Sequence, residues 1–275
     1  MTHDPTTAAP VCYRHPDRQT LLRCSRCDRP ICASCSIDAT VGQRCPSCVG
    51  AEGTQRELPV GRRRGASGAP ATMTFLGIAV LFYLITGFGG GGRGIYEALA
   101  QSNQAVAAGE WWRLFTPIFL HAPGIMHIAF NMYALWILGP QIERGVGSWP
   151  FAAAYLASAG VGGAFFYFLG DPIVPAVGAS GAIFGLFGIW FNWALRRRHT
   201  RYGRYLLNQI LVLLVINAAI PFLVPGIAWE AHLGGLIAGF AISEAWSRIK
   251  SDNPAMMRTL VALAAAILAV ASVMF

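Results

Sequence analysis

The sequence predicts an all-α, polytopic membrane protein with a small cysteine-rich domain at its N terminus. Apolar residues make up 55% of the 275 residues and charged residues only 12%, a composition that an ordinary soluble domain does not need. The long apolar segments follow residue 70, whereas all seven cysteines lie between residues 12 and 48. We therefore expect a cysteine-rich domain at 1–50, a basic flexible linker at 51–71 and a transmembrane domain at 72–275.

The apolar segments after residue 70 are long enough to cross a bilayer as helices. A helix of about 20 residues spans a hydrocarbon core about 30 Å thick. We expect seven such helices, which begin near Thr72, Gly124, Trp149, Gly178, Tyr205, Trp229 and Thr259. The intervening segment 88–123 carries Trp111 and Trp112 and is expected to be a loop lying partly in the headgroup layer, where Trp rings are favourable.

The basic residues predict the orientation, because cytoplasmic loops retain Lys and Arg. They precede the first expected helix and follow the second, fourth and sixth: Arg62, Arg63, Arg64, Arg144, Arg196, Arg197, Arg198, Arg201, Arg204, Arg248 and Lys250. This alternation predicts a cytoplasmic N terminus and an external C terminus in a bacterial plasma membrane. The net charge of +8 is then a consequence of topology, and we expect no nucleic-acid ligand.

Polar residues recur at one depth of the predicted bundle. The second, fourth and sixth helices run from outside to inside, and their first turns contain His127 with Asn131, Ser180, and His232, respectively. Polar groups inside a bilayer are costly and usually functional. Each could instead cap a helix or bond to a neighbouring carbonyl, but four at one level favour a shared site.

Glycines predict close contact between the fourth and sixth helices. Gly181, Gly185 and Gly188 fall near one face of the fourth, and Gly235 and Gly239 lie on one face of the sixth. Small residues let helix backbones approach closely in lipid. Close approach is what a serine hydroxyl needs to reach an imidazole at about 2.6 to 3.2 Å.

These segments together resemble the rhomboid family of intramembrane serine proteases over residues 70–275. The resemblance rests on Glu110-Trp111-Trp112-Arg113, His127-x-x-x-Asn131, Gly178-Ala179-Ser180-Gly181, and Ala231-His232 followed by Gly235 and Gly239. It implies a six-helix core plus one C-terminal transmembrane helix. The tetrapeptide recurs as Gly65-Ala66-Ser67-Gly68 in the polar linker, where Ser67 has no histidine partner and is interpreted as a decoy.

The resemblance implies a role for each site residue. Ser180 is the nucleophile and His232 its general base, in a dyad without a carboxylate. His127 and Asn131, with the Ser180 backbone N–H, stabilise the oxyanion, and Phe184 packs on the histidine. The implied substrates are single-pass or other transmembrane proteins, cleaved within the lipid bilayer without a catalytic cofactor. The alternatives are an inactive rhomboid-like factor that binds membrane proteins, and a transporter.

Other polar residues of the membrane part are not assigned to chemistry. Arg113 is expected to anchor the interfacial loop, and His121 is interpreted as a surface histidine. Glu143 is expected to pair with Arg144 or with loop backbone, and Glu230 is interpreted as an interfacial residue.

The cysteines and one histidine form four C-x-x-C-type pairs in the N-terminal domain. These are Cys12 with His15, Cys24 with Cys27, Cys32 with Cys35, and Cys45 with Cys48. Eight such ligands suit two tetrahedral structural zinc sites, whereas disulfides would leave one cysteine over and are disfavoured in the cytoplasm. Alternate pairing, with the first and third pairs at one zinc, resembles B-box and RING-like modules; two sequential zinc ribbons are the alternative.

The role of this zinc module is left open by the sequence. A domain of about 50 residues has a small core, so metal binding would supply most of its folding energy. We expect it to bind a cytoplasmic protein partner or a substrate tail. Ubiquitin ligation, nucleic-acid binding and a purely structural cap are the alternatives.

Overall fold

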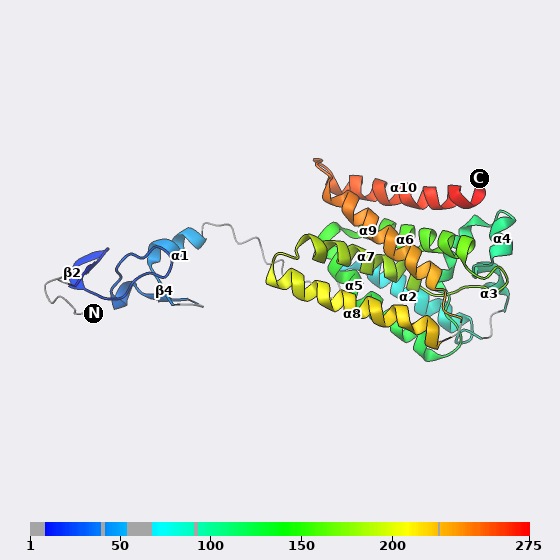
Figure 1. The fold of residues 1–275 in the computed structure, drawn as a ribbon, viewed down its shortest axis with the longest axis horizontal. Helices are drawn as coiled ribbons and strands as arrows, with labels where there is room; N and C mark the ends of the chain where they lie inside the picture. Colours follow the sequence, from blue (N-terminus) through cyan, green and yellow to red (C-terminus); the bar gives the residue numbers. More distant parts are fainter. Residues whose placement is uncertain (1–8, 40–41, 54–67, 91–92, 225) are drawn as a thin grey trace. The chain divides into compact units, whose positions relative to one another are not determined.

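The computed structural model describes residues 9–39, 42–53, 68–90, 93–224 and 226–275 (Figure 1). The chain divides into two compact units, Met1–Arg64 and Gly65–Phe275. Ser67 and the arginines at 62–64 lie outside the described residues.

The described part of the N-terminal unit is built from very short elements. Two antiparallel strand pairs, a 3-10 turn and one helix follow each other along the chain: β1 (Val11–Cys12), β2 (His15–Gln19), η1 (Ala33–Cys35), β3 (Ile37–Asp38), β4 (Gln43–Arg44) and α1 (Pro46–Gly53). Its buried cluster consists of Ile31 and five cysteines. Three of the four strands have only two residues. Because isolated two-stranded hairpins are at best marginally stable, this unit needs a source of order other than an apolar core.

The membrane unit consists of packed helices, which confirms the all-α fold class. Its long helices are α2 (Pro70–Ile85), α5 (Ile125–Val146), α6 (Ser148–Leu169), α7 (Ser180–Arg196), α8 (Arg201–Leu223), α9 (Trp229–Ser247) and α10 (Pro254–Met274). They correspond to the seven predicted helices. α8 begins before the predicted Tyr205 because the Thr200 side chain caps it, and α10 begins before Thr259 because Asn253 caps it.

Of the described helices, only three are both long and apolar enough to cross a membrane by length and composition alone: α6, the 201–221 part of α8, and α10. α2 and α7 are shorter, at 16 and 17 residues. α5 and α9 contain charged residues such as Glu143 and Glu244. The helices that do not meet both criteria include those that contain the predicted site residues.

Helix α7 lies at the centre of the bundle, where it contacts α5, α6, α8 and α9 (Figure 1). Helix α8 packs chiefly on α7, and its apolar side chains, including Leu213, Val215 and Ile216, are exposed. An exposed apolar face of this kind is expected of a lipid-facing helix. The central position of α7 surrounds its first residue, Ser180, with other helices.

The segment predicted as an interfacial loop contains short helices. They are α3 (Arg93–Leu99), α4 (Asn103–Ala107), and the 3-10 helices η3 (Trp111–Leu114) and η4 (Thr116–Phe119). Trp111 and Trp112 are partly exposed, as an interfacial position requires.

Arg113 holds this segment together from inside, which agrees with its predicted structural role. Its Nε donates to Glu110 Oε2 at 2.6 Å, and its Nη1 donates to the carbonyls of Glu97 and Ala100 at 2.6 and 2.7 Å. The side chain is buried, so these acceptors replace the water that its charge has lost.

Glu143 contacts backbone, one of the two predicted possibilities, but the backbone is that of another helix. Its carboxylate accepts from the N–H groups of Ala71 and Thr72, in the first turn of α2, at 2.9 and 2.8 Å. The hydroxyls of Thr72 and Ser148 also donate to it, at 2.7 and 2.6 Å. A carboxylate at a helix N terminus satisfies free N–H groups and suits the helix dipole.

Candidate active site and candidate metal centre

Ser180 and His232 form a hydrogen-bonded pair across two helices. Ser180 is the first residue of α7, and His232 lies in the first turn of α9. The Ser180 Oγ and His232 Nε2 atoms are 2.8 Å apart, a hydrogen-bond distance. A hydroxyl in this contact with an imidazole has the arrangement of a nucleophile and its base.

Glycines bring these two helices together, as the sequence predicted. A β carbon at Gly235 would overlap the carbonyl oxygen of Gly181, and one at Gly239 would overlap that of Gly185. Any larger residue at these positions would push α9 away from α7. The short contact between Ser180 and His232 therefore depends on backbone packing along the helices.

The ring of His232 is held in place by Phe184, one turn after Ser180. The two ring centroids are 4.2 Å apart and the planes differ by 6°, a stacked arrangement. Among the described residues no carboxylate is hydrogen-bonded to His232. Glu230, interpreted as interfacial, lies in the first turn of α9 and is 9% exposed.

His127 presents one ring nitrogen to the same space. Its Nδ1 accepts a hydrogen bond from the Ala122 N–H at 3.1 Å, so the proton of a neutral ring lies on Nε2. A β carbon at Gly178 would lie 2.7 Å from that Nε2 and 3.7 Å from Ser180 Oγ. Gly178 also has a φ of +125°, so glycine is required here for both conformation and space.

Asn131 lies one turn along α5 from His127, but its side chain bonds to its own helix. The amide Nδ2 donates to the His127 carbonyl at 2.9 Å. Among the described residues, the Asn131 side chain makes no hydrogen bond to Ser180. The structure thus brings Ser180, His232 and His127 together and leaves Asn131 adjacent, with one amide hydrogen still available.

His121 was interpreted as a surface histidine, and this interpretation is wrong. The residue is 0% exposed, and its ring packs edge-on against His127 with centroids 5.2 Å apart. Neither ring nitrogen has a well-aligned hydrogen-bond partner among the described residues. Its apolar flanking residues, Leu120 and Ala122, were the sequence signal for burial.

The N-terminal unit gathers its cysteines and His15 into two clusters. One contains Cys12, His15, Cys32 and Cys35, and the other contains Cys24, Cys27, Cys45 and Cys48. Within each cluster the potential ligand atoms lie within 4.8 Å of one another. The side chains therefore follow the alternating arrangement and not the sequential one.

The spacing within the clusters fits a tetrahedral metal ion. His15 Nδ1 lies 3.8, 3.4 and 3.3 Å from the sulfurs of Cys12, Cys32 and Cys35. Bonds of about 2.1 to 2.3 Å to zinc place tetrahedral ligands about 3.4 to 3.8 Å apart. The pKa of the Cys32 thiol is lowered to about 5, chiefly by the Ser34 hydroxyl 3.1 Å from its Sγ and further by Cys12 and His15. Burial and the neighbouring sulfurs raise the pKa of the Cys35 thiol to about 11.

Comparison with known proteins agrees with the geometry of the membrane unit. The family model "Rhomboid domain" matches residues 108–249, more than half of the chain. Rhomboid protease GluP of Bacillus subtilis is 40% identical over 172 residues, which cover 62% of this chain and 33% of GluP. Rhomboid protease AarA of Providencia stuartii is 28% identical over 212 residues, covering 66% of this chain and 73% of AarA.

The matched range 108–249 includes the helices that contain Ser180, His232, His127 and Asn131. The chain spans about a third of the length of GluP. On the basis of the family match, the chain belongs to the rhomboid family and is a multi-pass membrane protein.

Proposed function

We propose that the membrane unit is an intramembrane serine endopeptidase that cleaves transmembrane substrates by a Ser180–His232 dyad. The observation that carries the proposal is the 2.8 Å contact between Ser180 Oγ and His232 Nε2. Relatives named as rhomboid proteases support it. An inactive, membrane-protein-binding role is the second possibility, and it is less favoured because both members of the dyad are present and in contact.

In the proposed reaction, Ser180 Oγ attacks the carbonyl carbon of the scissile peptide bond while His232 Nε2 accepts the hydroxyl proton. The stacked Phe184 ring keeps the imidazole plane fixed during this transfer. His232 then gives the proton to the departing amine. In the second half, His232 Nε2 takes a proton from water as the water oxygen attacks the ester carbonyl; the bond to Ser180 Oγ then breaks, and His232 returns the proton to Ser180 Oγ.

The oxyanion formed in each half of the reaction needs donors in place beforehand. The Ser180 N–H at the N terminus of α7 and the His127 Nε2–H are the proposed donors. The free hydrogen of the Asn131 amide is a third. Removal of one such donor typically lowers the rate by about 10² to 10³-fold.

The N-terminal unit is proposed to bind two structural zinc ions, one in each cysteine cluster, and to recruit a cytoplasmic protein partner. We further propose that the N terminus lies in the cytoplasm of a bacterial cell, because the positively charged loops then face inward. All seven cysteines lie in the N-terminal unit, so after chelation a membrane-impermeant thiol reagent should react with them in inverted vesicles and not in intact cells. The opposite pattern would overturn the orientation.

Cleavage of a transmembrane reporter in proteoliposomes tests the protease proposal. Wild type is compared with Ser180→Ala, His232→Ala and the matched control Ser67→Ala, and each is also treated with a fluorophosphonate serine probe. We expect wild type and Ser67→Ala to cut and be labelled, and the dyad variants to lose about 10⁴-fold or more of activity. A folded wild type that neither cuts nor is labelled would favour the inactive binding role.

A further inference from the structure

A cavity lies at the end of the helix bundle opposite the dyad. It has a volume of about 440 Å³ and lies between the C-terminal ends of α5, α7 and α9 and Arg258 near the start of α10. Ser180, in contrast, begins α7. Pockets of about 300 to 1,000 Å³ hold small molecules, so the cavity is large enough for a ligand. Ser180 is not among the residues that line it.

Three arginines line this cavity, and their charge is only partly compensated. Arg196 pairs with Glu244 at 3.0 Å, but Glu244 also binds Arg248 at 2.9 Å. In the described part of the chain, Arg197 and Arg258 form no ion pair. The buried Nε of Arg258 also has no hydrogen-bond partner there. Arg197 is exposed, but a buried donor left unpaired, as Arg258 Nε is, is costly, and an anion in the cavity would satisfy it.

Neutralising helix ends is the structural alternative for these arginines, because α7 and α9 both end here and helix C termini carry partial negative charge. Arg198 does bond to such a carbonyl, that of Leu195. No hydrogen bond of this kind involves the Arg197 or Arg258 side chain among the described residues. These two guanidinium groups therefore have donors available for a ligand.

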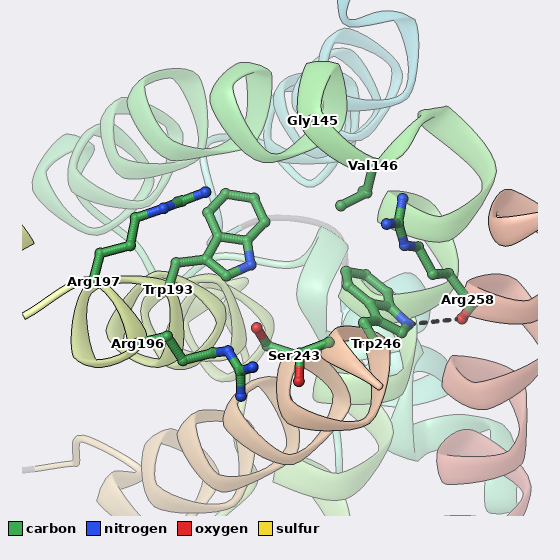
Figure 2. A pocket seen from close by; sticks show the side chains of 9 residues that line it. Gly145, Val146, Trp193, Arg196, Arg197, Ser243, Trp246 and Arg258 are labelled. Carbon is green, nitrogen blue, oxygen red and sulfur yellow. Dashed lines mark hydrogen bonds between the residues drawn. The ribbon is translucent and has the colours of Figure 1, made fainter. Parts of the chain in front are cut away.

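Two tryptophans shape the walls of the cavity (Figure 2). Figure 2 shows Trp193 beside Arg197 on one side and Trp246 beside Arg258 on the other. The Trp193 ring packs next to Gly145, where a β carbon would be 3.5 Å away. The Trp246 indole N–H donates to the Arg258 carbonyl at 2.9 Å. This bond fixes the start of α10 beside the cavity.

We propose that this cavity binds the phosphate-containing headgroup of an anionic phospholipid. Guanidinium groups bind phosphate oxygens in pairs, and basic pockets between transmembrane helices suit anionic headgroups. Tryptophan is favourable at the depth of the headgroups, which favours a membrane lipid over a free phosphate ion. The proposal does not depend on the protease function.

Native mass spectrometry of the delipidated full-length protein tests this proposal. The protein is titrated with dioleoyl phosphatidylglycerol, dioleoyl phosphatidylcholine or inorganic phosphate. The variants are Arg197→Gln and Arg258→Gln, and the matched control is Arg201→Gln, an exposed arginine in the first turn of α8 outside the cavity lining. We expect wild type and the control to bind phosphatidylglycerol about tenfold more tightly than phosphatidylcholine. Each cavity variant should bind phosphatidylglycerol about fivefold more weakly than wild type does, with its affinity for phosphatidylcholine unchanged.

Three results would overturn the proposal: equal binding of the two lipids by wild type, unchanged lipid preference in both cavity variants, or inorganic phosphate that competes with phosphatidylglycerol as an equal ligand. If a glutamine variant fails to fold, the melting temperature of wild type decides. Phosphatidylglycerol must then raise it more than phosphatidylcholine does at the same concentration.

Discussion

In the N-terminal unit, eight sulfur and nitrogen ligand atoms converge from loops and very short strands. In the membrane unit, Ser180 and His232 meet because two long helices touch along their glycines. The first arrangement has a buried cluster of little more than cysteines, so we propose that bound metal supplies its order. The second is held by packing over many residues. The loss of one contact should therefore affect the two units very differently.

The largest expected effect is the removal of metal from the N-terminal unit. Chelation should unfold it, because apparent zinc binding free energies of about 10 to 16 kcal/mol serve as folding free energy in such small domains. Hydrogen–deuterium exchange of the full-length protein should then rise over residues 11–48 and stay unchanged in α5, α7 and α9.

The matched variants for this test are Cys32→Ser, which replaces a ligand sulfur by oxygen, and the control Ser36→Ala, which removes the hydroxyl of a residue outside both clusters. Only Cys32→Ser should mimic chelation. Protection that survives chelation in residues 11–48 would mean that this unit, like the membrane unit, is held by packing.

Removal of a single site side chain from the membrane unit should leave its fold intact. His127→Ala should lower reporter cleavage by about 10² to 10³-fold, because one oxyanion donor is lost, while the circular dichroism spectrum stays that of wild type. His199→Ala, which changes an exposed histidine on the α7–α8 connection, is the control. Wild-type activity in His127→Ala would exclude it as a donor.

A change in helix spacing should act on the dyad without touching either of its residues. Gly235→Ala places a β carbon against the Gly181 carbonyl oxygen, and a displacement of about 1 Å can cost about 10²-fold in rate. Gly77→Ala in α2 is the matched control, since nothing lies within 4 Å of its β carbon. Equal cleavage rates for the two variants would show that the dyad does not depend on glycine packing.

The smallest expected effect concerns stability alone. Glu143→Gln keeps the shape of the side chain but removes the negative charge of the carboxylate, whose two oxygens accept hydrogen bonds from N–H groups of α2. The free energy of unfolding should therefore fall by about 1 to 3 kcal/mol. Thermal unfolding in detergent measures this, with the exposed Glu97→Gln as control. A loss no larger than that of the control would mean that water or Ser148 compensates.

Local sequence was sufficient for much of the fold. The apolar segments predicted all seven long helices, and α9 begins at Trp229 as predicted. Hydropathy alone misplaced the starts of α8 and α10, because Thr200 and Asn253 extend these helices into polar sequence by capping them. The short helices between 93 and 119 could not be predicted from hydropathy, because they are fixed by contacts such as those of Arg113 with distant carbonyls.

The sequence by itself determined which residue types stand at the helix starts and which cysteines are available as ligands, since motif spacing and composition are local properties. Only the tertiary structure decided the 2.8 Å meeting of Ser180 with His232, the burial of His121 against His127, and the alternating grouping of the cysteines. Each of these joins positions brought together by packing or chain crossing, and no periodicity along the chain encodes the separation of two side chains in space.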